Sequence, residues 1–171
     1  DKTLRVWNAE TGELIHTLKD HNKARGVSVY HVSVDKEMKL RAVSTGSGLT
    51  LSIWDLDAGT LVKRIETGHT ATVWGLEVID DREMPQADGK PAKKPMAITW
   101  SNDRAIKVWN LEHEQEREVV AARRQVNPGP MCLCVLPASY ALGTFPMLVG
   151  GFRSIQLVDV SNVGTGPSGG A

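Results

Sequence analysis

The chain has 171 residues, enough for one or two ordinary domains with a sizeable buried core. Its 20 basic side chains balance 20 acidic ones, so the broad positive field that draws proteins to phosphate backbones is missing. Nucleic acid is therefore not the expected partner. Hydrophobic residues make up 41% of the chain, which indicates a soluble, globular protein.

The two cysteines, Cys132 and Cys134, lie two residues apart in MCLCVL, where a strand would point both side chains the same way. That geometry is poor for a disulfide between them. So few cysteines favour an intracellular, reducing compartment, and we expect both thiols to be buried or half-buried in the core. A Cys-x-Cys pair without a second cluster of ligands also falls short of a zinc site.

One charge-free stretch, between Arg124 and Arg153, has the length of a membrane span. Prolines and glycines interrupt it, and irregular backbone would leave polar groups unsatisfied in lipid, so two core strands joined by a loop explain it better. The chain begins at Asp1 rather than at a Met, and we expect it to be a fragment of a longer protein.

Four segments repeat one pattern: TLRVWN at 3–8, LSIWDL at 51–56, AIKVWN at 105–110 and SIQLVDV at 154–160. Each alternates apolar and polar residues and ends at Asn or Asp, which predicts a strand with one buried face that stops at a turn. Spacings of 47, 55 and 49 residues separate the Trp or Val near the end of each copy. Such a period predicts an array of repeated units.

The first three copies are each followed by a turn and a second amphipathic run, at 9–18, 57–65 and 112–120. Thr11-Gly12 and Ala58-Gly59 supply the turn residues of the first two hairpins. The third run, EHEQEREVV, contains good helix formers, but its position predicts an outer strand. Two further apolar runs follow in each period, so a period holds four short strands and the chain thirteen in all.

Two insertions differ in character. Residues 80–95 are polar, contain proline and are rich in charge, which predicts a solvated loop. Residues 137–146 carry no charge, and their Tyr140 and Phe145 form a candidate apolar patch. The alternative for this loop is that it folds back over an exposed edge of the core. The end of the chain, 162–171, is a Gly/Ser-rich tail.

By residue type, His69, Asp103 and a hydroxyl at Thr99 or Ser101 make up an acid, base and nucleophile set, and hydrolysis by this set is the enzymatic hypothesis. Nothing else in the chain suggests an oxyanion hole. The five histidines are dispersed, and neither a phosphate-binding loop nor a dinucleotide fingerprint occurs. The sequence therefore predicts no cofactor and no metal ion.

The repeated Trp-Asp or Trp-Asn ends, the Gly-His or Asp-His pair about 14 residues later, and SNDRAIKVWN closely resemble WD-repeat β-propellers. The likeness is strong in the repeats that end at Trp7, Trp54 and Trp109, and weak where Val158-Asp159 replaces Trp-Asp. It implies an all-β fold of four-stranded antiparallel blades, with the signature Trp on the third strand of each.

The resemblance divides the chain into the end of a broken blade (1–19), two blades (20–67 and 68–122), a degenerate partial blade (123–161) and the tail. Propellers close with about four to eight blades, so the ring is incomplete. We expect the remaining blades of the parent chain, or another copy, to close it, because open sheet edges otherwise invite pairing with other chains.

The resemblance also implies a structural role for the polar residues. Blades of this family commonly contain a hydrogen-bonded chain from the strand Trp to a Ser or Thr, then to the loop His and the turn Asp. The matching residues are Trp109, Thr99, His69 and Asp103. The Thr99 hydroxyl would then be occupied rather than free to attack. In the repeat that ends at Trp54 the matching positions are His21, Ser44 and Gly48, so the Asp is lost.

A partner-binding rim follows from the same resemblance. In the family, residues that open each inner strand, and those before the turn Asp, ring one end of the propeller and often contact partner peptides. Here these are Arg25, Trp74, Asn102 and Met131. Trp74 is the strongest candidate, because a displayed Trp offers large apolar area at small entropic cost. Packing between blades is the alternative for this residue.

These features predict an intracellular, non-catalytic scaffold that binds protein or peptide partners through the rim of a propeller, with neither nucleic acid nor a membrane as its partner. The alternative is a regulatory or sensor propeller domain of a larger enzyme whose catalytic part lies outside this chain.

Overall fold

The computed structural model describes residues 2–19, 23–46, 48–79, 95–111, 120–125, 130–135, 146–151 and 154–159. At 120–125, 146, 158 and 159 it describes the backbone alone. Most of the predicted loop at 80–95, the tail at 162–171, and the candidate patch residues Tyr140 and Phe145 lie outside the described residues.

Thirteen strands make up the described part of the chain, and none of the described residues is helical. The strands are β1 (Thr3–Trp7), β2 (Leu14–Lys19), β3 (Ala24–Val34), β4 (Glu37–Gly46), β5 (Thr50–Asp55), β6 (Thr60–Glu66), β7 (Val73–Ile79), β8 (Met96–Ser101), β9 (Ala105–Asn110), β10 (Val120–Gln125), β11 (Pro130–Val135), β12 (Pro146–Gly151) and β13 (Ser154–Asp159). Strands that neighbour in sequence pair antiparallel into sheets of two, four, four and three. The all-β prediction is confirmed.

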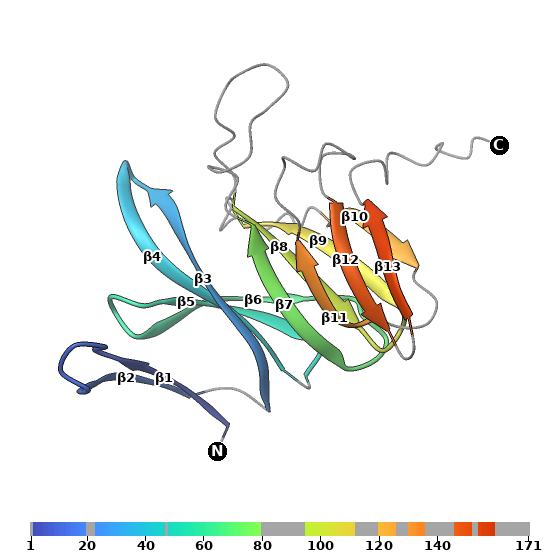
Figure 1. Cartoon of the computed structure of the whole chain (residues 1–171). Coiled ribbons are helices and arrows are strands. Elements are labelled where there is room, and N and C mark those ends of the chain that lie inside the picture. Colours follow the sequence, from blue (N-terminus) through green and yellow to red (C-terminus); the bar gives the residue numbers. More distant parts are fainter. Residues whose placement is uncertain are drawn as a thin grey trace.

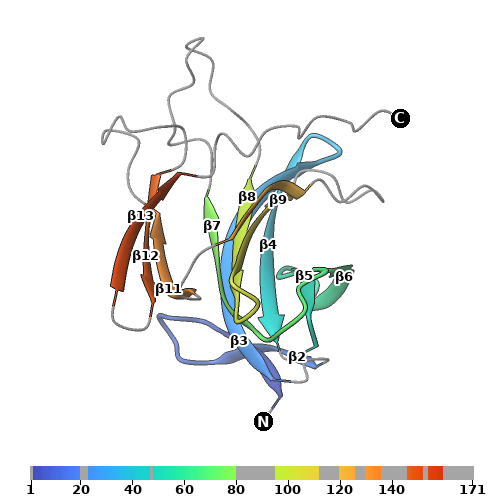
Figure 2. The ribbon, with the colours of Figure 1, turned by 90° about the vertical axis from the view of Figure 1, so that its right-hand side faces the viewer.

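The four sheets follow one another in space in chain order and do not close into a ring (Figures 1 and 2). The inner strands β3, β7 and β11 begin at one end of this array, on the lower side of Figure 1. Register places the turns at 46–50 and 101–105 at the same end, because Ala24 pairs with Gly46 and Val73 with Ser101. We call this end the proximal pole and the opposite end the distal pole.

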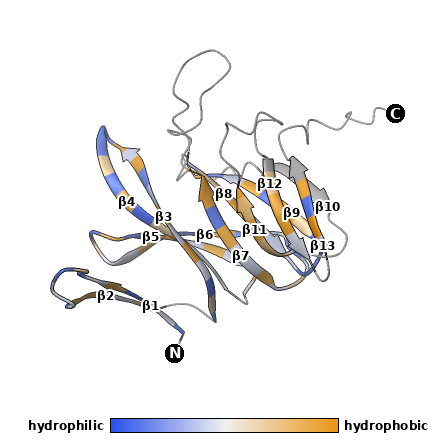
Figure 3. Cartoon of the chain, in the orientation of Figure 1, coloured by the Kyte–Doolittle hydropathy of each residue, from blue (hydrophilic) through white to orange (hydrophobic). Residues whose placement is uncertain are grey.

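Apolar side chains that alternate along the strands fill the spaces between successive sheets. Leu18, Ala42 and Trp54 lie between the first and second sheets, residues such as Tyr30, Leu51, Leu76 and Trp109 between the second and third, and Ile98, Trp100, Met147 and Val149 between the third and fourth. Hydrophobic residues dominate β7, β8 and β11, whereas the first part of β4 is largely hydrophilic (Figure 3). Burial of these alternating residues holds the sheets face to face.

The Asn or Asp after a signature Trp caps the hairpin that follows. Asn8 Oδ1 accepts backbone N–H hydrogen bonds of 2.8 and 3.0 Å in the turn after β1. Asp55 Oδ1 accepts two of 2.9 Å in the turn after β5. Gly12 and Gly59 then adopt φ values of +73° and +67°, where a residue without a Cβ is unstrained. Both repeats therefore use the same kind of turn, which begins at the Asn or Asp and ends at the Gly.

The described part of the outer strand of the third sheet is β10, which covers Val120–Gln125 and pairs with β9. The sequence predicts this strand at 112–120, and residues 112–119 lie outside the described residues.

Both cysteines are exposed, so the expectation of buried or half-buried thiols is wrong. Strand alternation does place Cys132 and Cys134 on one face of β11, and register puts the exposed Leu148, Ile155 and Leu157 on that same face. The opposite face of this sheet packs against the third sheet. Among the described residues no further sheet covers the cysteine face, which is a consequence of the open ring.

Candidate functional site

A line of four polar side chains crosses the third sheet. Trp109 Nε1 on β9 lies 2.9 Å from Thr99 Oγ1 on β8, which lies 3.0 Å from His69 Nε2. His69 Nδ1 lies 2.9 Å from Asp103 Oδ2. His69 comes from the loop between β6 and β7, and Asp103 from the turn between β8 and β9. The structure thus brings together the four residues that the resemblance to the WD-repeat family selects.

The three hydrogen bonds run in one direction. The indole N–H of Trp109 only donates, so Thr99 Oγ1 accepts from it. The Asp103 carboxylate only accepts, which assigns the imidazole proton to Nδ1 and leaves Nε2 to accept the hydroxyl proton of Thr99. Every polar atom along this line then has a partner, and a fully satisfied buried network of this kind stabilises a fold.

The line is closed to solvent, since Thr99 is 0% exposed and His69 is 3% exposed. The Thr99 oxygen already contacts two ring nitrogens. The alternative nucleophile, Ser101, is also buried and donates to the carbonyl of Ala71 at 2.9 Å. A nucleophile needs a hydroxyl that a substrate can reach, so this arrangement suits support of the sheet better than attack on a substrate.

Asp103 is the anionic end of the line. Oδ2 also accepts the backbone N–H of Thr70 at 2.9 Å, and Oδ1 accepts that of Ala105 at 2.9 Å. Burial acts to raise the pKa of the Asp103 carboxyl, but these N–H groups and His69 outweigh it and hold the pKa below its usual value. The carboxylate therefore ties the loop at 67–72 to the turn at 101–105.

Among the described residues, the second sheet shows the first link of such a line. Trp54 Nε1 donates to Ser44 Oγ at 2.8 Å, and Ser44 lies 3.4 Å from the carbonyl of Ser52. Gly48 stands where the third sheet has Asp103 and offers no carboxylate. His21, the predicted imidazole of this repeat, lies outside the described residues.

Trp7 differs from the other two signature tryptophans. It is 53% exposed, whereas Trp54 and Trp109 are each 2% exposed. The sheet of Trp7 consists of β1 and β2 alone, so no neighbouring strand presents a Ser or Thr at its side. The three tryptophans follow the same pattern in the sequence. Trp7 is more exposed because the described part of its sheet lacks further strands.

The four predicted rim residues are all exposed at the proximal pole. The structure brings two of them together, because the Arg25 guanidinium carbon lies 4.6 Å from the centroid of the Trp74 ring. Trp74 is 38% exposed, so it neither projects freely nor fills the space between sheets. Asn102 lies in the turn after β8, and Met131 lies near the start of β11.

Trp100 is the tryptophan that packs between two sheets, which was the alternative for Trp74. Its ring is buried between the third and fourth sheets, and its indole N–H donates to the carbonyl of Met131 at 3.2 Å. A Cβ at Gly75 would collide with this ring. Gly75 and Trp100 are direct cross-strand partners, so a Gly opposite a Trp was the signal in the sequence.

Lys107 is a second residue that sequence reasoning missed. It is buried on β9, donates from Nζ to the carbonyl of Thr67, and lies 5.9 Å from the ring centroid of Trp109. A Lys in the middle of the apolar strand AIKVWN was the signal, because a buried ammonium group needs partners of this kind.

Known proteins share this architecture. The chain is 28% identical over 116 residues to the nuclear distribution protein PAC1 of Arthroderma otae, covering 65% of this chain and 23% of that protein. It is 23% identical over 111 residues to the WD repeat domain-containing protein 83 homolog of Dictyostelium discoideum, covering 65% and 29%. The solved WD40 β-propeller domain of Doa1 matches with a TM-score of 0.63 at 19% identity, covering 92% and 44%. The chain has the fold of a WD-repeat β-propeller. No family model matches it.

The propeller ring is incomplete in this chain, and its sheets are blade 1 (β1–β2), blade 2 (β3–β6), blade 3 (β7–β10) and blade 4 (β11–β13). The chain spans less than a third of each of the two relatives named above. Within the described blades, no group of three or more His, Cys, Asp or Glu side chains lies close enough to hold a metal ion. The same residues include no helix with the length and apolar character needed to cross a membrane.

Proposed function

We propose that this propeller is an intracellular, non-catalytic scaffold that binds protein or peptide partners at its proximal pole. The observation that carries the proposal is the exposed Trp74, held under the Arg25 guanidinium at 4.6 Å where two blades meet. Trp and Arg are the residue types that most often anchor protein interfaces, because each adds a large contact area and directional hydrogen bonding. We expect neither nucleic acid nor a membrane to be the partner.

The framework beneath this pole supports the proposal. Asp103 and His69 join the loop at 67–72 to the turn at 101–105. The backbone carbonyl of Thr67 also accepts a hydrogen bond from the ammonium group of Lys107. Surfaces that are fixed before binding lose less conformational entropy when a partner docks. Trp74 is the second residue of β7, which begins directly after this loop. The hydrogen bonds that hold the loop therefore also limit the position of Trp74.

The buried state of the polar line supports a function without catalysis. A hydrolase would need Thr99 at an accessible surface, yet its oxygen is buried between two ring nitrogens. We infer that His69 and Asp103 contribute to stability and not to turnover.

We further propose that remaining blades of a parent chain, or another copy, complete the ring. Among the described residues, blade 4 exposes Leu148, Ile155 and Leu157 on one face, and blade 1 exposes Trp7 and Leu14. Sheet faces of this kind are stable in water only when another sheet covers them.

The test compares two exposed apolar side chains. Trp74→Ala removes the proposed anchor, and Met38→Ala removes a side chain that is even more exposed but lies near the start of β4, away from the proximal pole. Partners captured from a lysate by each variant would be quantified by mass spectrometry, with melting curves as the folding control. We expect Trp74→Ala to lose captured partners by about tenfold or more, as for an interface anchor, and Met38→Ala to keep them. Equal recovery by wild type and Trp74→Ala would overturn the proposal.

A further inference from the structure

We propose that the proximal pole recognises acidic peptide segments, with the Arg25 guanidinium, stacked on Trp74, as the anchor for a carboxylate. This inference rests on the proposed function, because it assigns a class of partner to the same pole.

The guanidinium of Arg25 is available on the surface to bind an anionic group. The Trp74 ring lies under its guanidinium, which restricts the side chain and leaves the N–H edge exposed. Among the described residues, no carboxylate forms an ion pair with Arg25; the ion pairs present are Lys39 with Glu37, Arg41 with Asp55, and His69 with Asp103. A planar, fixed guanidinium with free donors matches the two oxygens of a carboxylate.

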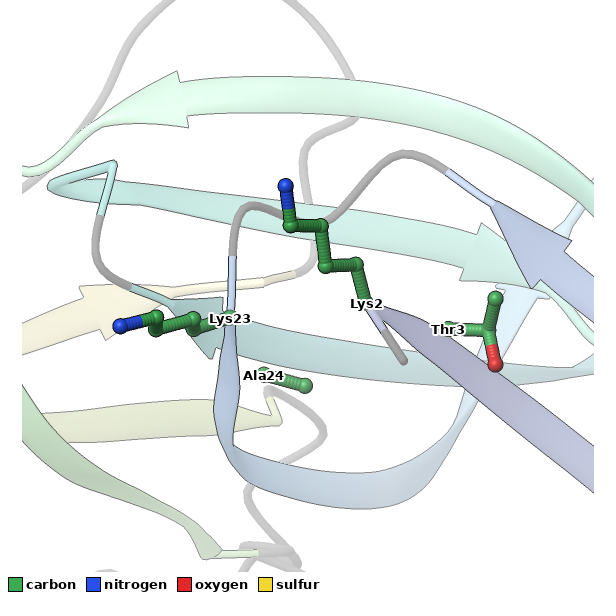
Figure 4. Close-up of a pocket in the computed structure, with 4 residues that line it drawn as sticks. All are labelled: Lys2, Thr3, Lys23 and Ala24. Atoms are coloured by element: carbon green, nitrogen blue, oxygen red, sulfur yellow. The ribbon is translucent and has the colours of Figure 1, made fainter.

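Further cations surround this anchor. Lys2 and Lys23 line an open cavity of about 470 Å³ together with Thr3 and Ala24, where the starts of β1 and β3 approach each other (Figure 4). Both lysine side chains extend to the same side of the view, away from Thr3 (Figure 4). Ala24 directly precedes Arg25 in the chain, so this cavity lies at the same pole as the anchor.

Arg104 adds a fourth exposed cation at this pole. It lies in the turn before β9, at the position that Lys2 occupies before β1, and the two have similar φ values of +65° and +67°. The described carboxylates at the proximal pole are Glu66, at the end of β6, and Asp103, which is already bound by His69. The described part of this pole is therefore positive, although the chain as a whole carries no net charge.

The distal turns carry the opposite charge. Their described acidic residues are Glu10, Glu13, Asp35, Glu37, Asp55 and Asp57. Of the described cations nearby, Lys39 and Arg41 already pair with Glu37 and Asp55, and Lys36 lies in the turn after β3. The described parts of the two poles thus differ in sign, and an acidic partner would be attracted to the proximal pole and repelled by the distal one.

A peptide fits this surface better than a nucleic acid. The cations form a small group and not a continuous track, whereas binding to a phosphate backbone requires many contacts along its length. Trp74 and Met131, both exposed at the same pole, offer apolar contact area of the kind that peptide side chains use.

The experiment measures fluorescence anisotropy of a labelled deca-glutamate peptide, with deca-glutamine and a single-stranded oligothymidylate of equal charge as the comparison probes. The variants are Arg25→Gln, Arg25→Lys and Lys63→Gln. Lys63 lies in the middle of β6, away from the pole, so its variant removes the same formal charge without touching the proposed site. Far-UV circular dichroism confirms that each variant is folded.

We expect deca-glutamate to bind and deca-glutamine not to bind. Loss of a charge-assisted contact should weaken binding by about tenfold in Arg25→Gln, and Arg25→Lys should recover only part of that loss because it lacks the planar fork. Lys63→Gln should change affinity by less than about twofold, and affinity should fall as salt is raised.

Three results would overturn the inference: equal binding of the two peptides, an equal effect of Lys63→Gln and Arg25→Gln, or binding of oligothymidylate as tight as that of deca-glutamate. These failures are separate from failure of the proposed function. If Trp74→Ala loses its captured partners while deca-glutamate does not bind, the pole remains a partner site but not one for acidic peptides.

Discussion

Blades 2 and 3 have the same four-stranded topology and bury their signature Trp to the same extent, but their polar connections differ. In blade 3 the line runs from Thr99 through His69 to Asp103, whereas in blade 2 Gly48 stands at the position of Asp103 and offers no carboxylate. Blade 2 therefore forms without a carboxylate at this turn position. The His and Asp add a connection between the loop and the turn at the proximal pole.

The turn of blade 2 at 46–50 is held by Thr67, the residue that directly follows β6. Thr67 donates from its backbone N–H and its hydroxyl to the carbonyl of Leu49, at 3.0 and 2.6 Å. The hydroxyl of Thr67 also accepts the N–H of His69 at 3.2 Å. The turn without a carboxylate is thus held by the loop that the His69 line fixes, so damage to blade 3 should also loosen blade 2.

The largest expected effect comes from the two buried tryptophans. Trp109→Ala and Trp54→Ala should each cost about 3–5 kcal/mol in unfolding free energy, because each deletes a large buried ring and leaves a cavity. Urea unfolding monitored by circular dichroism measures both. A loss well below this range in either blade would contradict the equal packing of the two rings.

Deletion of the central hydroxyl sharpens the comparison. Thr99→Val and Ser44→Ala each remove a buried hydroxyl that accepts the N–H of a signature Trp, and Thr99→Val also removes the bond to His69 Nε2. At about 1–3 kcal/mol for each unsatisfied buried group, both variants should lower the unfolding free energy. The same unfolding experiment measures both losses, and an unchanged stability in either variant would mean that its hydroxyl does not support the Trp.

Acid should remove the contribution that Asp103 in blade 3 makes to the unfolding free energy. Because the pKa of Asp103 is lower in the folded chain than in the unfolded one, its stabilising effect is complete above about pH 4 and is lost as pH falls through the folded value. The difference in unfolding free energy between wild type and Asp103→Asn should therefore be largest near neutral pH and close in acid. A difference that grows as pH falls would contradict the sign of this linkage.

The smallest expected effect is a gain in the stability of blade 2. Gly48→Asp places a carboxylate where Asp103 stands in blade 3, and an added Cβ at Gly48 meets only Thr50 Oγ1 at 3.7 Å, an ordinary contact. We expect a stabilisation of about 0.5–1 kcal/mol from the new turn hydrogen bond and the stiffer unfolded chain. Thermal unfolding measures it, and a lower melting temperature would show that the turns of the two blades are not equivalent.

Sequence predicted the strands because their alternation and the repeated Trp-Asx ends are local signals. It also selected the four residues of the polar line, since their spacing survives in one repeat. It placed the cysteines too deep, because the sheet that would cover them is absent from the described residues.

The contacts between blades were harder to predict. Trp74 and Trp100 both lie in strands of blade 3, and the pairing of Gly75 with Trp100 decides which ring is buried. The stacking of Arg25 on Trp74 depends on how two blades meet, which alternation within a strand does not encode.

The most direct test of the central claim, that His69 and Asp103 brace the propeller, is the melting temperature of Asp103→Asn at neutral pH, together with an assay for ester hydrolysis. Asp103 Oδ2 accepts from both His69 and Thr70, and an Asn would present an NH₂ group to donors on one of its two sides. Loss of these charge-assisted bonds should cost about 1.5–3 kcal/mol and lower the melting temperature by several degrees, with no hydrolysis by either protein. An unchanged melting temperature, with hydrolysis by the wild type that the variant loses, would contradict the account.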